Sequence, residues 1–181
     1  IKFHTNVKEE KICEKIAEKI YGYWQEMGRP LQFKIIEVGA GEGELMLHMM
    51  PAFSSRYPDL FDSLTYIIAD ISMPLLLTIK NKISNSEFKA KIIFLRASAL
   101  GIPLKDNAIT GVVISNELID DLPVHRVIKR NGILKEIYFE KNSLGWFNEK
   151  EDAVSDPGLI EYFNIAKGSS ELPDNQECVV N

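Results

Sequence analysis

The sequence predicts an α/β fold whose parallel sheet is covered on both faces. Four segments are expected to be strands because they are short, continuous apolar runs rich in β-branched residues: 33–38, 64–69, 90–95 and 109–114. Segments of helical character lie between the first three, at 44–53 and 74–83. Continuous apolar strands that alternate with helices are typical of parallel sheets, whereas half-exposed antiparallel strands alternate apolar and polar residues.

A long helix is expected before the first strand, over about residues 7–27 with Asn6 as its cap. Gly28 and Pro30 end it. Its apolar residues recur at the spacing of one helix face: Ile12, Cys13, Ile16, Ala17, Ile20 and Trp24. Lys and Glu occupy the opposite face, so the helix is predicted to pack on the sheet by its apolar side.

Prolines mark the later helices and connections. Pro51 interrupts the helical pattern near its end, so that helix is expected to stop at about Phe53. Pro74 stands in the first turn of the next helix, where proline is favoured. The stretch from 57 to 63 is expected to be a loop.

The pattern changes after Pro123. Asn131-Gly132 lies between two apolar–polar runs, which predicts a β-hairpin, and a third strand is expected at 144–147. A short helix at 157–167 and a polar loop at 168–177 follow. We therefore expect three parts, which are an α/β part at 1–123, an antiparallel hairpin insertion at 124–150, and a helix and loop at 151–181.

Composition excludes several classes of protein. With 181 residues, 45% hydrophobic and 26% charged, the chain is of ordinary globular type and not disordered. A net charge of −5 without a basic stripe argues against a nucleic-acid partner. No apolar run is long enough to span a membrane, and the first residues lack a signal-peptide pattern. Cys13 and Cys178 have no metal-site spacing and fit a reducing compartment, so no metal site is expected.

A glycine-rich loop is the strongest local motif. Gly39, Gly41 and Gly43 follow a strand and precede a helix, so the backbone can approach a ligand closely. A dinucleotide-binding loop would have a third glycine where this chain has Glu44, and a pyrophosphate would meet the charges of Glu42 and Glu44. S-adenosylmethionine lacks phosphate and carries a sulfonium and an ammonium, and it fits better. A plain glycine-rich turn is the alternative.

Two further strand ends point to a nucleoside. Asp70 ends the second strand, where an acid accepts hydrogen bonds from ribose hydroxyls. It follows Gly43 by 27 residues, and its alternative role is to cap the next helix. Ser98 and the backbone of Ala99, after the third strand, are expected to meet the adenine.

The fourth strand is followed by a cluster of polar and acidic residues, Asn116, Glu117, Asp120 and Asp121. Substrates of open α/β sheets bind at such strand ends. The cluster could hold a cationic acceptor group through charge-assisted hydrogen bonds or accept a proton. The alternative is that these acids cap a helix.

Taken together, these motifs resemble the MidA family of S-adenosylmethionine-dependent methyltransferases, which includes the mitochondrial arginine methyltransferase required for respiratory complex I assembly. Four segments carry the resemblance: His4-Thr5; Gly28-Arg-Pro30 with Ile36-Glu-Val-Gly-Ala-Gly-Glu-Gly-Glu-Leu-Met46; Asp70-Ile-Ser72; and Ser115-Asn-Glu-Leu-Ile-Asp-Asp-Leu-Pro-Val-His-Arg126. The last is the most specific. Asp121 departs from the family, which usually has alanine there, and Asp70 stands where glutamate is common.

The resemblance implies a Rossmann-like class I methyltransferase sheet in the order 3-2-1-4. It implies that Glu37, Gly39, Gly41, Gly43 and Asp70 bind S-adenosylmethionine. It also implies that the methyl acceptor is lined by Asn116, Glu117 and Asp120. Members of the family continue into further strands, so the sheet is expected to be incomplete, as in a fragment, a partner-completed protein or a reduced homologue.

The predicted function is methyl transfer to a nitrogen acceptor, with a protein arginine side chain as one candidate. A protein substrate, a homodimer, and a location in the bacterial cytoplasm or the mitochondrial matrix are compatible with this. The alternative is a non-catalytic assembly factor that binds the nucleoside and contacts a partner through the hairpin at Trp146 and Phe147. A nicotinamide-dependent oxidoreductase is disfavoured by Glu44 and the acidic loop.

Overall fold

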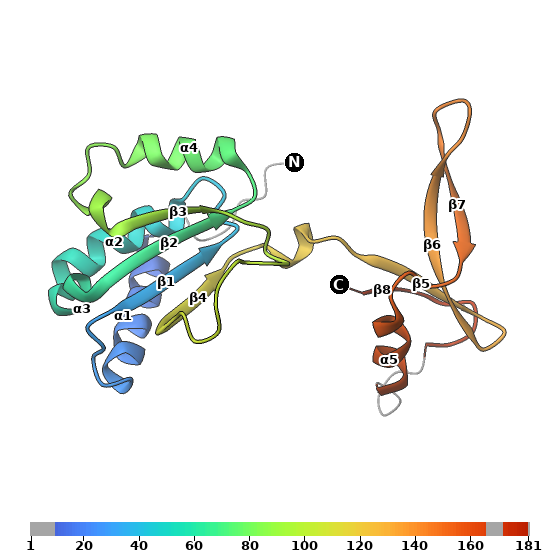
Figure 1. Ribbon diagram of the computed structural model, residues 1–181, viewed down its shortest axis with the longest axis horizontal. Coiled ribbons are helices and arrows are strands. Elements are labelled where there is room, and N and C mark those ends of the chain that lie inside the picture. Colours follow the sequence, from blue (N-terminus) through green and yellow to red (C-terminus); the bar gives the residue numbers. More distant parts are fainter. Residues whose placement is uncertain (1–9, 166–171, 181) are drawn as a thin grey trace. The chain divides into compact units, whose positions relative to one another are not determined.

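The computed structural model describes residues 10–165 and 172–180, and the chain divides into two compact units, Ile1–Leu118 and Ile119–Asn181 (Figure 1). The cap predicted at Asn6 and the loop predicted for 168–171 lie outside the described residues. Whether the chain is best divided at Pro123 stays a prediction. The hairpin and the C-terminal residues belong to one unit.

The first unit contains a four-stranded parallel sheet in the order β3-β2-β1-β4, which confirms the predicted fold class and order. The strands are β1 (Phe33–Val38), β2 (Leu64–Asp70), β3 (Ile92–Arg96) and β4 (Gly111–Ser115). Val38 pairs with Ala69 on one side and with Ser115 on the other. The carboxyl ends of these three strands therefore meet at one edge of the sheet.

Helices cover one face of this sheet. They are α1 (Glu10–Glu26), α2 (Glu44–Arg56), α3 (Pro58–Ser63) and α4 (Met73–Lys82). Phe33 and Ile35 of β1 and Tyr66 of β2 point into the main hydrophobic core with the apolar residues of these helices. Burial of this apolar surface is the dominant stabilising contribution.

The other face is covered differently from the prediction. Its buried residues, among them Ile36 and Ile67, pack against the chain of 97–110 and against Leu118. Apart from turns and an isolated bridge, that connection has no regular structure. Gly101, Pro103 and a turn with Asn107 at φ 57° interrupt it, which explains why no helix forms.

Two element predictions in this unit were wrong. Residues 57–63 were expected to be a loop, but Pro58 occupies the first turn of the short helix α3. Pro51 does not end α2, which continues to Arg56. Ser55 donates a side-chain hydrogen bond to the Pro51 carbonyl, and the buried Met49, Met50 and Phe53 hold the helix on the core. Tertiary packing thus outweighs the local cost of proline.

The second unit contains an antiparallel sheet in the order β7-β6-β5-β8. The strands are β5 (His125–Arg130), β6 (Ile133–Lys141), β7 (Phe147–Asp152) and β8 (Glu177–Val180), and the unit also holds the helix α5 (Pro157–Ile165) and the 3-10 turn Ile119–Asp121. Asn131 and Gly132 have φ values of 51° and 78°, so the predicted hairpin turn is confirmed.

Two features of the second sheet depart from the prediction. The third strand begins at Phe147, because the Asn142 carboxamide oxygen accepts hydrogen bonds from the N–H groups of Leu144 and Trp146 and turns the chain there. Strand β8, which was not predicted, follows the polar segment expected at 168–177 and pairs with β5, and Val127 opposes Cys178. Across 10–165 and 172–180, no helix is long and apolar enough to cross a membrane.

Candidate functional site

The glycine-rich loop joins β1 to α2 at the carboxyl edge of the parallel sheet. Gly39, Gly41 and Gly43 have φ values of 69°, 54° and 77°, in the left-handed region that glycine adopts without strain. The Gly39 N–H donates to the Ala69 carbonyl at 2.9 Å, and the Gly43 N–H donates to the Ala40 carbonyl at 2.8 Å. The loop is thus a hydrogen-bonded turn, whose start is bonded to β2 and whose end is bonded to Ala40 within the loop.

The three glycines face different surroundings. A Cβ added to Gly39 would lie 2.7 Å from Leu118 Cδ1, and one on Gly43 would lie 3.0 Å from the Ile79 side chain. A Cβ on Gly41 would meet no atom of the described residues within 4 Å. Gly39 and Gly43 therefore serve packing, whereas Gly41 borders open space where a ligand could approach the backbone.

Glu37 lies directly before this loop and is buried, with 3% of its surface exposed. It accepts a hydrogen bond from the Tyr66 hydroxyl at 2.8 Å. Burial raises the pKa of Glu37 to about 7, the Tyr66 bond opposes this rise, and the negative charge of Asp70 adds to it. Burial and Glu37 also raise the pKa of Tyr66 far above its usual range, so the phenol stays protonated and donates.

This acid is poised to change charge near neutral pH. A ligand that carries positive charge would favour its ionised form, because opposite charges lower the pKa of a carboxyl group. Cys13 of α1 lies close enough to Glu37 for that charge to raise the pKa of its thiol, in addition to the effect of burial.

Asp70 ends β2 and is 7% exposed. Its Oδ1 accepts a hydrogen bond from the Ser72 N–H at 2.8 Å, and Ser72, not Asp70, caps α4 through the Leu75 N–H. The register places Asp70 one residue beyond the Val38–Ala69 pair, beside the start of the glycine loop. The structure thus brings Asp70 and the loop to the same edge of the sheet, as the nucleoside prediction requires.

Ser98 and Ala99 follow β3 in a tight turn. The Ser98 hydroxyl accepts from the Leu100 N–H at 3.2 Å, and Ser98 bridges Gly101. Ala99 packs against the small core that includes Val38. Both residues thus have structural tasks, and a contact of either with adenine stays a prediction.

Asn116 and Glu117 follow β4, and both are exposed. Because Ser115 pairs with Val38, the strand register brings Asn116 beside the loop at Gly39. Glu117 has a φ of 47°, which is uncommon for a residue with a Cβ and costs about 1 kcal/mol. Such strain is concentrated at functional sites.

Asp120 and Asp121 lie in the 3-10 turn Ile119–Asp121, at the beginning of the second unit. Both are exposed. Their part in an acceptor site together with Asn116 stays a prediction.

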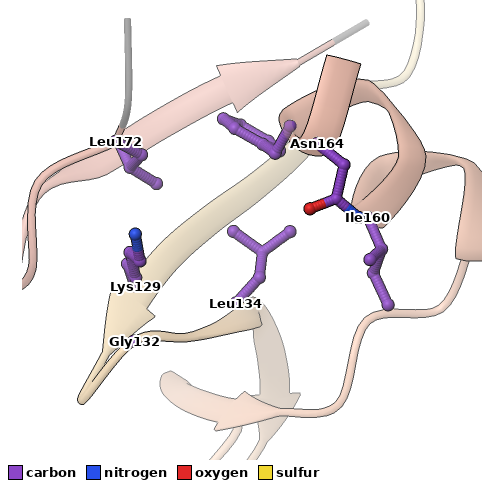
Figure 2. A pocket seen from close by; sticks show the side chains of 7 residues that line it. Lys129, Gly132, Leu134, Ile160, Asn164 and Leu172 are labelled. Carbon is purple, nitrogen blue, oxygen red and sulfur yellow. The ribbon is translucent and has the colours of Figure 1, made fainter. Parts of the chain in front are cut away.

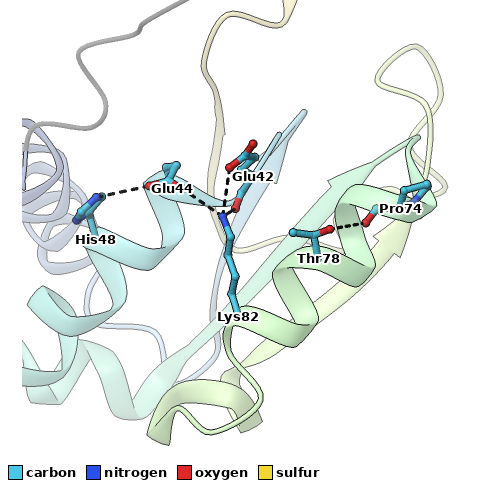
Figure 3. Close-up of polar contacts among 6 residues, drawn as sticks. All are labelled: Glu42, Glu44, His48, Pro74, Thr78 and Lys82. Atoms are coloured by element: carbon cyan, nitrogen blue, oxygen red, sulfur yellow. Dashed lines mark hydrogen bonds and ion pairs between the residues drawn. The ribbon is translucent and has the colours of Figure 1, made fainter. Parts of the chain in front are cut away.

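Charges beside the loop are paired in a way that the sequence did not reveal (Figure 3). Lys82, at the end of α4, donates to the Glu42 carbonyl at 3.0 Å and lies 3.3 Å from a carboxylate oxygen of Glu44. His48 approaches the other Glu44 oxygen at 3.9 Å. Because Lys82 partly neutralises Glu42 and Glu44, their repulsion of a phosphate ligand is weaker than the sequence alone suggested.

Two features of the second unit involve none of the predicted site residues. A cavity of about 320 Å³ lies between the hairpin, α5 and Leu172, lined by apolar side chains with Lys129 and Asn164 (Figure 2). His125 contacts buried Glu136 through Nδ1 at 2.7 Å. The Glu136 carboxylate also accepts from the Tyr138 hydroxyl and the Ser155 N–H.

The comparison with protein families gives the decisive observation. A family described as "Putative S-adenosyl-L-methionine-dependent methyltransferase" matches residues 15–178. The chain belongs to this family. The description of the family names the predicted cofactor, S-adenosylmethionine, and the match runs through both units of the chain. No curated protein matches the chain.

Solved structures support the fold of this chain. An uncharacterized protein of Burkholderia thailandensis is similar with a TM-score of 0.72 at 17% identity over 96% of this chain. A second protein from the same organism, described as a likely methyl transferase and solved with S-adenosyl-homocysteine bound, has a TM-score of 0.66 at 19% identity over 86% of this chain. The chain spans 42% and 38% of the lengths of these two proteins.

Proposed function

We propose that this protein is a methyltransferase that binds S-adenosylmethionine along the edge formed by β1, β2 and β4 and transfers its methyl group to a nitrogen acceptor. The observation that carries the proposal is the arrangement of Gly41, facing open space, with the acids Glu37 and Asp70 at one sheet edge. The family membership supports the cofactor, and the nitrogen acceptor is our inference from the acidic residues after β4.

Each element of the site has a task in this proposal. The first N–H groups of α2 have no partners within the helix, and they would bind the carboxylate of the methionine moiety. The Ser72 N–H bonds only Oδ1 of Asp70, and the other carboxylate oxygen would accept hydrogen bonds from the ribose hydroxyls. The cofactor's sulfonium and ammonium would favour the ionised form of Glu37, so binding near pH 7 would release a proton.

The acceptor is proposed to sit against Asn116, Glu117 and Asp120. Its nitrogen lone pair attacks the methyl carbon in line, and the carbon–sulfur bond breaks with its electron pair going to sulfur. The sulfonium becomes a neutral thioether, and the nitrogen loses its proton to a carboxylate. Positioning of the two reactants contributes much of the rate in such a displacement.

The finer assignment rests on the four motifs that resemble the MidA family. We infer that the chain is a member of that family and that a protein arginine is the acceptor to test first. The exposed carboxylate of Glu117, held at positive φ, suits a guanidinium group because carboxylates bind it with two parallel hydrogen bonds.

The first experiment is calorimetric titration of the chain with S-adenosylhomocysteine, with Asp70→Ala compared with wild type. Asp70→Ala is expected to weaken binding at least tenfold, because it removes the acceptor for the ribose hydroxyls. Equal affinity would refute the assigned site. Transfer of labelled methyl groups to arginine-containing proteins then tests the acceptor, and unchanged turnover in a Glu117→Ala, Asp120→Ala double variant would refute its acidic lining.

A second candidate function is a non-catalytic assembly factor. It is favoured by the turn between β6 and β7, where Leu144, Trp146 and Phe147 are 81%, 72% and 69% exposed. Exposed aromatic residues of this kind anchor protein interfaces. Cofactor binding without methyl transfer to any protein, together with a partner whose binding is lost in Trp146→Ala, would favour this function.

A further inference from the structure

Helix α4 contacts the glycine-rich loop at two places on one of its faces. Ile79 packs against Gly43 so closely that an added Cβ would lie 3.0 Å from it. Three residues later, Lys82 extends to the loop and donates to the Glu42 carbonyl at 3.0 Å (Figure 3). Residues three apart lie on the same side of a helix, so one face of α4 holds two successive residues of the loop.

The Lys82 bond determines the direction of a peptide plane. The Glu42 carbonyl and the Gly43 N–H belong to one planar peptide group and point in opposite directions. The carbonyl is bound by Lys82, and the N–H donates to the Ala40 carbonyl at 2.8 Å. The turn is therefore held from both sides, and this orientation leads directly into α2.

Lys82 also changes the electrostatics at the start of α2. Its ammonium lies 3.5 Å from a Glu42 carboxylate oxygen and 3.3 Å from one of Glu44. Without this cation, both acids would repel an anionic group at the N-terminus of the helix. The Lys82 side chain is 32% exposed, so solvent screens the ion pairs, whereas the carbonyl bond holds the orientation of the Glu42–Gly43 peptide.

We propose that Lys82 is a positioning residue of the cofactor site, which keeps the loop in its binding conformation and offsets the charge of Glu42 and Glu44. The inference rests on the proposed function, because it assumes that the cofactor's carboxylate binds at the start of α2. Lys82 is not proposed to contact the reacting atoms. Its effect is on affinity for the cofactor, not on the rate of methyl transfer.

The test compares Lys82→Met, Lys82→Arg and the matched control Lys80→Met by calorimetric titration with S-adenosylhomocysteine. Lys80 is in the same last turn of α4 and is exposed. Lys82→Met is expected to bind about tenfold more weakly, the loss of one charge-assisted hydrogen bond. Lys82→Arg should restore affinity to within about threefold, and Lys80→Met should bind like wild type.

Another variant separates the carbonyl bond from the ion pairs. A Glu42→Gln, Glu44→Gln double variant removes both carboxylates and keeps the Glu42 carbonyl. It is expected to bind at least as tightly as wild type, and weakening comparable to that of Lys82→Met would overturn the role of the carbonyl bond.

The unfolding midpoint without ligand distinguishes positioning from general stability. Lys82→Met is expected to shift it no more than Lys80→Met does. A large drop in the unfolding midpoint of Lys82→Met that is also present in Lys82→Arg would overturn the inference. Wild-type affinity for S-adenosylhomocysteine in Lys82→Met would overturn it as well. If the wild-type chain binds no S-adenosylhomocysteine, the proposed function itself fails, and the inference fails with it.

Discussion

Glu37 makes the stability of the first unit depend on pH, and this dependence can be worked out from its surroundings. The pKa of Glu37 is raised from 4.5 to about 7 in the folded protein, chiefly by burial. A raised pKa means that the folded state favours the protonated acid. The resulting stabilisation is fully present below pH 4.5 and is lost as pH rises through about 7.

The magnitude follows from the two pKa values. Each pKa unit corresponds to about 1.4 kcal/mol, so Glu37 lowers the free energy of unfolding by about 3 kcal/mol between pH 4 and pH 8. Glu37→Gln keeps the shape of the side chain and an acceptor for the Tyr66 hydroxyl, but it cannot ionise. Relative to wild type, the variant should therefore gain about 3 kcal/mol of stability over this range.

Urea unfolding at several pH values measures this difference. Fluorescence of Trp24, which is 3% exposed in the first unit, reports the transition, whereas Trp146 is already exposed in the folded state. Glu42→Gln is the matched control, because it removes a carboxylate that is 71% exposed. A difference between Glu37→Gln and wild type that stays constant from pH 4 to pH 8 would refute the reasoning. The same variant should bind S-adenosylhomocysteine more weakly, because the buried negative charge is gone.

Two other substitutions test the structure of each unit. Gly111→Ala should abolish folding of the first unit in circular dichroism melts, because the new Cβ would lie 1.8 Å from the Lys34 carbonyl oxygen within the β1–β4 pair. Gly101→Ala is the control and should melt like wild type, because a Cβ there meets open space. A Gly111→Ala variant that folds like wild type would contradict the pairing of β1 with β4. Burial would raise the pKa of Glu136, but hydrogen bonds from His125, Ser155 and Tyr138 outweigh it and lower that pKa to about 2. Because the pKa is lowered, the stabilisation from Glu136 is present above pH 4.5 and is lost towards pH 2. Glu136→Gln should therefore make the free energy of unfolding less dependent on pH between pH 4.5 and pH 2, and an unchanged dependence would count against this network.

Much of the fold was predictable because it depends on local sequence. The continuous apolar runs predicted all four parallel strands, the family resemblance implied their order, and the Asn131-Gly132 turn predicted the hairpin. Predictions failed where packing decides. Pro51 is accommodated within α2 because neighbouring residues are buried, and β8 forms because β5 offers it an open edge.

The candidate site, too, depends in part on local sequence and in part on packing. The sequence by itself predicted the glycine loop, Glu37, Asp70 and the polar residues after β4 as candidate site residues, because ligands of parallel sheets bind at the carboxyl ends of the strands. Only the tertiary structure decided that Tyr66 donates to Glu37, that Leu118 and Ile79 pack on the loop, and that Lys82 holds the Glu42 carbonyl. These contacts join residues 29 to 79 positions apart, and such pairs come together only when the strands align and the helices pack on the sheet.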